Sequence, residues 1–202
     1  MNLAVLGATG RTGTLVVEQA LAAGHTVTAL VRSPEKLTIG NPNLRVVTGQ
    51  VTDTSAVSRA LEGADAVIST LGGKGSLIAD STAVIVAAAR QTGVSRVVVL
   101  STFAVERDRL DGIGRLLTSL AIGPLIKDKS VGENLLRQSD LDWTIAYASA
   151  LTDGPASGSV EELPETAKRR LSEKISRADV AAWMVQAATG VQHSRRSVGI
   201  TG

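Results

Sequence analysis

A glycine-rich turn near the start of the chain separates an apolar segment from a helical pattern. Residues 7–13 read Gly-Ala-Thr-Gly-Arg-Thr-Gly and follow directly on the apolar run 3–6. From 14 to 23, apolar residues recur at the spacing of a helix. A glycine motif between a strand and a helix is the arrangement that binds the diphosphate of a dinucleotide. The alternative is an ordinary tight turn between the two elements.

The three glycines of this turn have different tasks. Gly7 permits the tight turn, Gly10 lets the backbone approach a diphosphate, and Gly13 lets the helix pack on the strand. The bound diphosphate would meet free N–H groups and the positive end of the helix dipole. We therefore expect a cofactor-binding loop that also includes Thr9, Arg11 and Thr12.

Length and composition favour one domain, residues 1–202, with a sizeable core. Hydrophobic residues make up 44% and charged residues 20%, which argues against disorder. The longest apolar run, around 83–89, falls far short of the roughly 18 residues that a membrane span needs. The chain has no cysteine, which excludes disulfides and cysteine-ligated metals. No basic segment precedes the first strand, so we expect a cytoplasmic protein without a membrane contact.

Charge and aromatic content argue against a nucleic-acid partner. The net charge is only +2, and the chain has one Phe, one Tyr and two Trp to stack on bases. The two histidines, His25 and His193, fall in predicted turns without a partner nearby in sequence. We therefore expect neither a metal site nor a histidine base.

Apolar runs alternate with helical patterns through most of the chain. Runs such as Val97–Leu100 fit strands that are buried on both faces of a parallel sheet. The predicted fold is α/β, a Rossmann-type doubly wound parallel sheet of about seven strands, ordered 3-2-1-4-5-6-7, with helices on both faces. The predicted strands are 3–6, 26–31, 45–47, 66–69, 97–100, 143–146 and 197–200. The predicted helices are 12–23, 54–62, 76–91, 127–139 and 177–188.

Two segments interrupt this alternation. In 106–124, four apolar residues (Ile113, Leu116, Leu117 and Leu120) form one helical face, whereas 151–173 is rich in Gly, Ser, Pro and charge. Both segments follow strands whose carboxyl ends face the ligand in an open α/β sheet. We expect them to cover a substrate; the alternative is an extra core helix and a surface loop.

The strand ends supply the remaining candidate cofactor residues. Arg32 lies about 20 positions after the glycines, where an acidic residue would bind the ribose 2′-hydroxyl of NAD. A guanidinium suits a 2′-phosphate instead, so we expect NADP(H) to be preferred over NAD(H). Arg11 would add a second contact, unless it is simply an exposed residue at a helix start. The other predicted contacts are Gln50, Val51, Thr70, Leu71, Gly72, Ser101 and Thr102, whereas Asp53 is expected to cap the next helix.

These motifs resemble a known family. The glycine turn, the strand ends Ile68–Gly72 and Val99–Thr102, and the pattern Lys129-(x3)-Glu133-Asn-Leu-Leu-Arg137 are similar to the atypical short-chain dehydrogenase/reductases. Within those, the chain most resembles the NAD(P)H-binding, NmrA-like group that includes biliverdin-IXβ/flavin reductases. The segment Ile175–Ala181 is similar to the start of the family's late helix. The resemblance implies a nicotinamide cofactor and says less about the substrate.

The chain departs from the superfamily where a catalytic Tyr-x-x-x-Lys pair is usual. Lys129 stands in the position of the lysine, but Leu125 replaces the tyrosine and cannot donate a proton. The resemblance implies that Lys129 holds the nicotinamide ribose, unless it is a surface lysine. Ser101 and Lys129 are the candidate catalytic residues. Phe103 and Tyr147, at the ends of their strands, are the candidate walls of a substrate pocket.

Two functions fit these residues. The first is an NADPH-dependent reductase that transfers hydride to a planar conjugated acceptor, such as a flavin, a quinone or a tetrapyrrole. The resulting anion takes its proton from solvent, so the missing tyrosine is no obstacle. The alternative is a non-catalytic NADP(H)-binding sensor of the NmrA-like type, which would have a protein partner. Nucleotide-sugar epimerisation would need the tyrosine that is absent.

Overall fold

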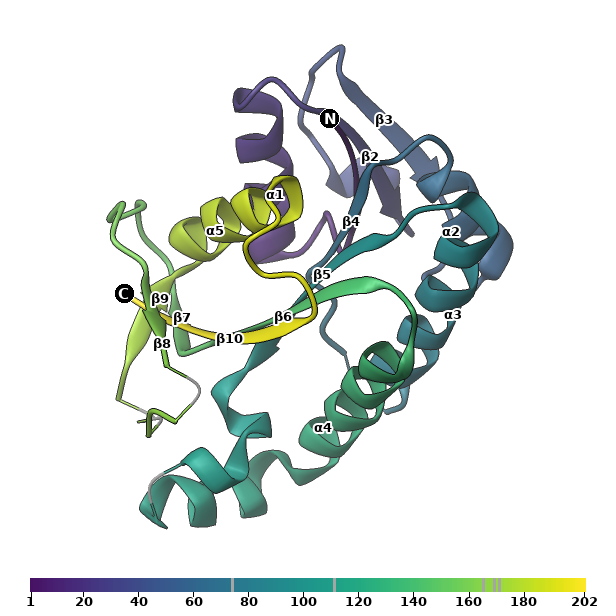
Figure 1. The fold of residues 1–202 in the computed structure, drawn as a ribbon. Helices are drawn as coiled ribbons and strands as arrows, with labels where there is room; N and C mark the ends of the chain where they lie inside the picture. Colours follow the sequence, from purple (N-terminus) through teal and green to yellow (C-terminus); the bar gives the residue numbers. More distant parts are fainter. Residues whose placement is uncertain (74, 111, 165, 169, 171) are drawn as a thin grey trace.

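The protein is built on one eight-stranded sheet (Figure 1). A computed structural model describes residues 1–73, 75–110, 112–164, 166–168, 170 and 172–202, without the side chains of 107 and 112–122. The strands run in the order β3-β2-β1-β4-β5-β6-β10-β8, and all except the antiparallel β8 are parallel. The predicted order of the seven parallel strands is therefore confirmed. The strands are β1 (Asn2–Leu6), β2 (Thr26–Val31), β3 (Leu44–Thr48), β4 (Ala66–Ser69), β5 (Arg96–Thr102), β6 (Asp142–Ala148), β8 (Glu161–Leu163) and β10 (Arg196–Thr201).

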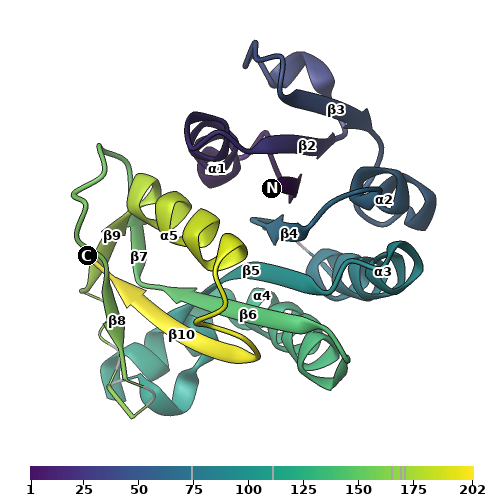
Figure 2. The same cartoon turned by 45° about the horizontal axis from the view of Figure 1, so that its top comes forward.

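Helices cover both faces of the sheet, as the fold class requires. Figure 2 shows α1 (Arg11–Ala22) and α5 (Arg177–Thr189) on one face, and α2 (Thr54–Leu61), α3 (Leu77–Thr92) and α4 (Gly112–Gln138) on the other. Short 3₁₀ helices follow β2 at Pro34–Lys36 and β5 at Phe103–Val105 and Arg107–Arg109. A small second sheet pairs β7 (Ala150–Thr152) with β9 (Lys174–Ser176).

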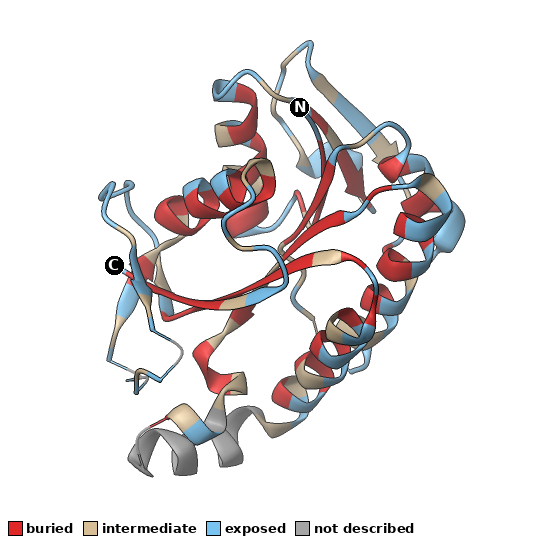
Figure 3. Ribbon diagram, viewed as in Figure 1, coloured by how far each residue is buried: buried red, intermediate tan, exposed pale blue. Residues whose placement is uncertain are grey.

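The apolar strands are buried on both sides, which explains their continuous hydrophobic runs. In β1, Leu3 and Val5 belong to the core beneath α1 and α5, whereas Ala4 and Leu6 belong to the core beneath α2 and α3. The central strands are accordingly buried along most of their length in Figure 3. This double burial holds the carboxyl ends of the strands, where the candidate residues lie, along one edge of the sheet.

The two predicted interruptions differ from expectation in their local structure. The helix expected to begin near Lys127 begins at Gly112 and continues through Pro124, a residue that usually ends a helix. The apolar face predicted at 113–120 falls on side chains outside the described residues. The segment 151–173 was expected to cover a substrate, or else to be a surface loop, and it contains β8 and most of β7, each only three residues long. Strands this short carry too few residues for a periodic signal.

Asp179 ties the second of these segments to α5. Its carboxylate accepts hydrogen bonds from the N–H groups of Ser157 and Gly158, both at 3.0 Å, and from the hydroxyls of Ser157 and Ser176 at 2.9 and 2.8 Å. Burial alone would raise the pKa of Asp179, but these hydrogen bonds hold it below its usual value. The ionised carboxylate therefore fixes the 157–158 turn against the start of α5.

We predict that Asp179→Asn lowers the free energy of unfolding by about 2 kcal/mol at neutral pH, because a charged acceptor of several buried hydrogen bonds is lost. Since the pKa of Asp179 is depressed in the folded state, its contribution is complete above its unfolded pKa of about 3.9 and disappears as pH falls through the folded value. Urea denaturation between pH 3 and 8 measures this. The matched variant Asp53→Asn, at the exposed cap of α2, should show a smaller decrease in the free energy of unfolding. An equal decrease in the two variants would contradict the anchoring role of Asp179.

Candidate functional site

The glycine turn has the geometry that the sequence predicts. Gly7 has φ +88°, and a Cβ built on Gly13 would lie only 2.0 Å from the Gly7 carbonyl oxygen. At Gly10 such a Cβ would make one tight contact, with the same oxygen at 3.2 Å, and would meet no other neighbouring atom within 4 Å. Helix α1 starts here with no side-chain cap and no acidic residue in its first turn. Its positive end is therefore available to an anionic ligand.

A groove of about 360 Å³ extends from this turn along the carboxyl ends of β1, β2, β3 and β4. Most of the predicted cofactor residues line it: Gly7, Thr9, Gly10, Arg32, Gln50, Val51, Thr70, Leu71 and Gly72. Asp53 lies outside the lining and caps α2, accepting hydrogen bonds from the N–H groups of Ser55 at 2.9 Å and Ala56 at 3.4 Å. As predicted, Gln50 and Val51 therefore line the groove, whereas Asp53 caps the next helix.

A second cation lies beside Arg32 in this groove. Lys36, at the end of the 3₁₀ helix after β2, lines the groove together with Arg32, and both side chains belong to exposed residues. Neither forms an ion pair within the described part of the chain. The sequence analysis missed Lys36, although its spacing of four residues from Arg32 is visible in the sequence. Two free cations at the end of β2 suit a phosphate group.

Arg11 is placed differently. It does not line the groove, and its guanidinium forms an ion pair with Asp153, which also pairs with Arg177 at 2.8 Å. Thr12 is buried, and Gly13 packs on the turn itself. A contact of these three residues with a cofactor stays a prediction.

A smaller cavity, of about 20 Å³, lies at the ends of β4 and β5 and adjoins the groove, since Leu71 lines both. Ser101 and Lys129 line this cavity. Lys129 is only 9% exposed, and its ammonium donates a hydrogen bond to the Leu100 carbonyl at 3.2 Å. Burial lowers the pKa of Lys129, while the neighbouring carboxylates of Glu133 and Asp128 act in the opposite direction. The alternative of a solvated surface lysine is therefore wrong.

Asp128 fixes the helix that carries Lys129. Its carboxylate accepts hydrogen bonds from the N–H groups of Ile78 and Ala79, each at 2.9 Å, in the first turn of α3. Because Asp128 holds α4 to α3, the side chain of the next residue, Lys129, points toward the end of β5. The position of Lys129 is thus set by packing between two helices.

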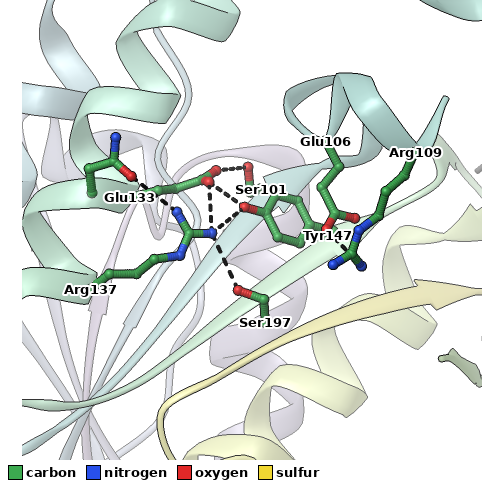
Figure 4. A network of polar contacts seen from close by, with 8 residues as sticks. Ser101, Glu106, Arg109, Glu133, Arg137, Tyr147 and Ser197 are labelled. Atoms are coloured by element: carbon green, nitrogen blue, oxygen red, sulfur yellow. Dashed lines mark hydrogen bonds and ion pairs between the residues drawn. The ribbon is translucent and has the colours of Figure 1, made fainter. Parts of the chain in front are cut away.

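Next to the small cavity lies a buried polar network, shown in Figure 4. Glu133 accepts hydrogen bonds from the Ser101 hydroxyl at 2.6 Å, from the Tyr147 hydroxyl, and from Arg137 at 3.4 Å. Arg137 also donates to the Tyr147 oxygen at 2.7 Å and to Ser197 at 3.3 Å. Burial and the adjacent Glu133 raise the pKa of Tyr147 well above its usual value. Tyr147 therefore stays neutral and donates its proton to Glu133.

Glu133 and Arg137 were not predicted as site residues and entered only through the family resemblance. Their spacing was nevertheless informative: Lys129, Glu133 and Arg137 recur every four residues and so share one face of α4. That face meets the ends of β5 and β6. Three charged residues on a helix face that packs on a sheet indicate a buried ionic cluster.

The two candidate substrate residues are inside the protein. Phe103 and Tyr147 are each 2% exposed, and neither lines the groove. Thr102 caps the 3₁₀ helix after β5, accepting a hydrogen bond from the Ala104 N–H at 3.4 Å. Glu106 and Arg109, an ion pair at 3.1 Å in Figure 4, belong to the segment expected to cover the substrate. Contacts of Phe103, Tyr147 and Thr102 with ligands stay predictions.

Comparison with known proteins agrees with this architecture. A protein family described as NAD(P)H-binding matches residues 7–190. The chain belongs to this family. A reductase of (4-alkanoyl-5-oxo-2,5-dihydrofuran-3-yl)methyl phosphate from Streptomyces griseus is 30% identical over 98% of this chain and 67% of its own length. Photosystem II assembly factor Ycf39 from Synechocystis is 30% identical over 76% of this chain and 46% of its own length.

Solved structures show the same fold. A short-chain dehydrogenase/reductase from Veillonella parvula in complex with NADP superimposes with a TM-score of 0.87 at 18% identity, covering all of this chain and 94% of that one. ChuY, described as an anaerobillin reductase from Escherichia coli O157:H7, has a TM-score of 0.83 at 24% identity, covering 99% and 96% of the two chains. These two structures are each less than 25% identical to this chain and show the fold, and the family match confirms the NAD(P)H-binding part of the predicted resemblance.

The described residues include no group of three or more His, Cys, Asp or Glu side chains placed to hold a metal ion. Among these same residues, no helix combines the length and the apolar character required to cross a membrane.

We predict that Gly10→Val abolishes cofactor binding and leaves the sheet folded. Gly10 has φ −82° and ψ 162°, which valine adopts readily, and its Cβ would make one tight contact, at 3.2 Å from the Gly7 carbonyl oxygen. A small shift relieves this contact, while the side chain occupies the place expected for a diphosphate. Calorimetric titration with NADPH, together with circular dichroism, measures both effects. The matched variant Gly40→Val, in a loop where a Cβ meets nothing within 4 Å, should bind normally. Unchanged affinity in folded Gly10→Val would contradict the site.

Proposed function

We propose that this protein is an NADPH-dependent reductase that transfers hydride to a planar conjugated acceptor, such as a flavin, a quinone or a tetrapyrrole. The observation that carries the proposal is the continuous arrangement of an open helix N-terminus, a groove with two free cations and a buried lysine at the end of β5. A bound nicotinamide cofactor would supply the hydride. The family and a reductase relative support this class of reaction.

The groove residues provide binding and orientation. Backbone N–H groups at the start of α1 would hold the diphosphate, and Val51 would pack on the adenine. Arg32 and Lys36 would face the 2′-phosphate, which distinguishes NADPH from NADH. Lys129, beyond Leu71, would hold the ribose next to the nicotinamide.

The residues at the other end of the site explain the choice of acceptor. Leu125 has no proton to give, and the Tyr147 hydroxyl is already committed to Glu133. A ketone would need an acid at this point. A conjugated ring spreads the charge left by hydride transfer, and water can then protonate it. The buried positive charge of Lys129 would stabilise such an anion.

The NADP(H)-binding sensor is the alternative function. It would use the same groove, and binding of NADPH with no oxidation by any acceptor would favour it. The buried Lys129 favours the reductase, because burial lowers its pKa and a perturbed ionisable group beside a cofactor groove is typical of catalytic sites.

We predict that the wild type binds NADPH more tightly than NADH and that Arg32→Ala removes most of this preference. Loss of a charge-assisted contact costs about 1.5–3 kcal/mol, so NADPH affinity should fall about ten- to hundredfold, with little change for NADH. Lys36→Ala should also lower the affinity for NADPH but not that for NADH, by a smaller factor than Arg32→Ala. Arg59→Ala, an exposed arginine outside the groove, is the matched control. Equal affinity of the wild type for the two cofactors would refute the preference.

We predict that the protein oxidises NADPH with a flavin, quinone or tetrapyrrole and not with simple ketones. Lys129→Met and Tyr147→Phe should each lower kcat by less than about a hundredfold, since an obligatory general acid contributes about 10²–10⁴. Absorbance at the nicotinamide band against a panel of acceptors tests this. A larger loss in Tyr147→Phe would reveal an acid that the proposed mechanism lacks.

A further inference from the structure

The hydrogen bonds of Glu133 determine the direction in which Ser101 points its proton. Arg137 donates to the Tyr147 oxygen, so the Tyr147 proton goes to one oxygen of Glu133. The other oxygen lies 2.6 Å from the Ser101 hydroxyl. With Arg137 beside it, Glu133 is an ionised carboxylate, which accepts hydrogen bonds and cannot donate them. The Ser101 proton is therefore held on the Glu133 side.

Ser101 consequently has only lone pairs left for a ligand. Lys129, which lines the same small cavity, donates to the Leu100 carbonyl, and the described contacts include no bond from Lys129 to Ser101. A serine hydroxyl that gives its proton to a carboxylate can still accept one or two hydrogen bonds. In this cavity Ser101 is thus an acceptor, the reverse of a proton-donating serine.

The cavity limits what can donate to Ser101. Its volume of about 20 Å³ has room for one polar group of the size of a water molecule. The buried ammonium of Lys129 would repel a cationic donor. Because Leu71 lines both the cavity and the groove, a group of a ligand in the groove can reach the cavity. A neutral N–H group meets all three conditions.

We propose that Glu133 fixes Ser101 as a hydrogen-bond acceptor, and that Ser101 recognises a neutral N–H group of a bound ligand. The N–H belongs either to the carboxamide of the nicotinamide cofactor or to a ring of the acceptor. In the second case the acceptor is an N–H-bearing heterocycle rather than a quinone. This inference rests on the proposed function for the identity of the ligands, and Glu133 acts in it as a positioning residue.

Binding measurements separate the two sources of the N–H without requiring turnover. In the first arm, calorimetry compares NADP⁺ with its 3-acetylpyridine analogue, which keeps the carbonyl and lacks the N–H. In the second arm, with NADP⁺ saturating, it compares riboflavin with 3-methylriboflavin, which lacks the ring N–H. We expect the wild type to prefer the N–H-bearing ligand about tenfold in one of the arms. The arm that shows the preference identifies the source.

Two variants test the roles of the residues. Ser101→Ala should abolish the preference, because it removes the acceptor. Glu133→Gln should also abolish or invert it, because the amide can donate to Ser101 and turn the hydroxyl proton toward the cavity. If Glu133 had a merely structural role, Glu133→Gln would lower the affinity for both ligands of a pair by the same factor. Ser58→Ala is the matched control and should keep the preference, because it removes a buried hydroxyl on α2 that donates to Gln91 of α3, away from the cavity.

The outcomes distinguish this inference from the proposed function. Tight NADP⁺ binding with no preference in either arm, or a preference that survives in Ser101→Ala, overturns the inference and leaves the reductase intact. Absence of NADP⁺ binding by the wild type overturns both. A preference that is lost in Ser101→Ala supports the inference even if no acceptor is reduced.

Discussion

The contact of Gly13 with the Gly7 carbonyl is the constraint on which the rest of the site depends. A side chain at Gly13 would come within 2.0 Å of that oxygen, so only glycine lets α1 start this close to the end of β1. The contact directs the uncapped end of α1 toward the edge of the sheet where Arg32 directly follows β2 and Thr70 directly follows β4. Since β1 is buried on both faces and pairs with β2 and β4, neither partner of the contact can move away.

The parts that sequence reasoning predicted are those that depend on local pattern. Apolar runs such as Val97–Leu100 gave the parallel strands and their order, and the glycine spacing gave most of the groove. The start of α4 could not be obtained this way, because Pro124 is a helix breaker that tertiary packing overrides. The pairing of Arg11 with Asp153 joins residues 142 positions apart, and no local pattern reports such a contact.

The ionic cluster on α4 shows why this end of the candidate site is harder to predict than the groove. Burying Lys129 and Glu133 and half-burying Arg137 costs free energy unless each charge finds partners, and those partners come from β5, β6 and β10. The helical spacing of the three residues is visible in the sequence. The contacts of these residues with Ser101 and Tyr147 depend on how α4 lies on the sheet. The hydrogen bonds that Asp128 accepts from the first turn of α3 fix this position of α4.

The two halves of the site therefore follow different physical rules. The phosphate end of the groove is formed largely by backbone and small residues, such as Gly7, Thr9 and Gly10, and the glycine spacing predicts it directly. The other end is formed by side chains from α4, β5 and β6, and a single substitution there changes a donor into an acceptor. Glu133 illustrates this, since its charge decides the direction of the Ser101 hydroxyl. If the proposed role of Ser101 holds, the choice of ligand beyond the cofactor depends on the charges on α4 rather than on the fold.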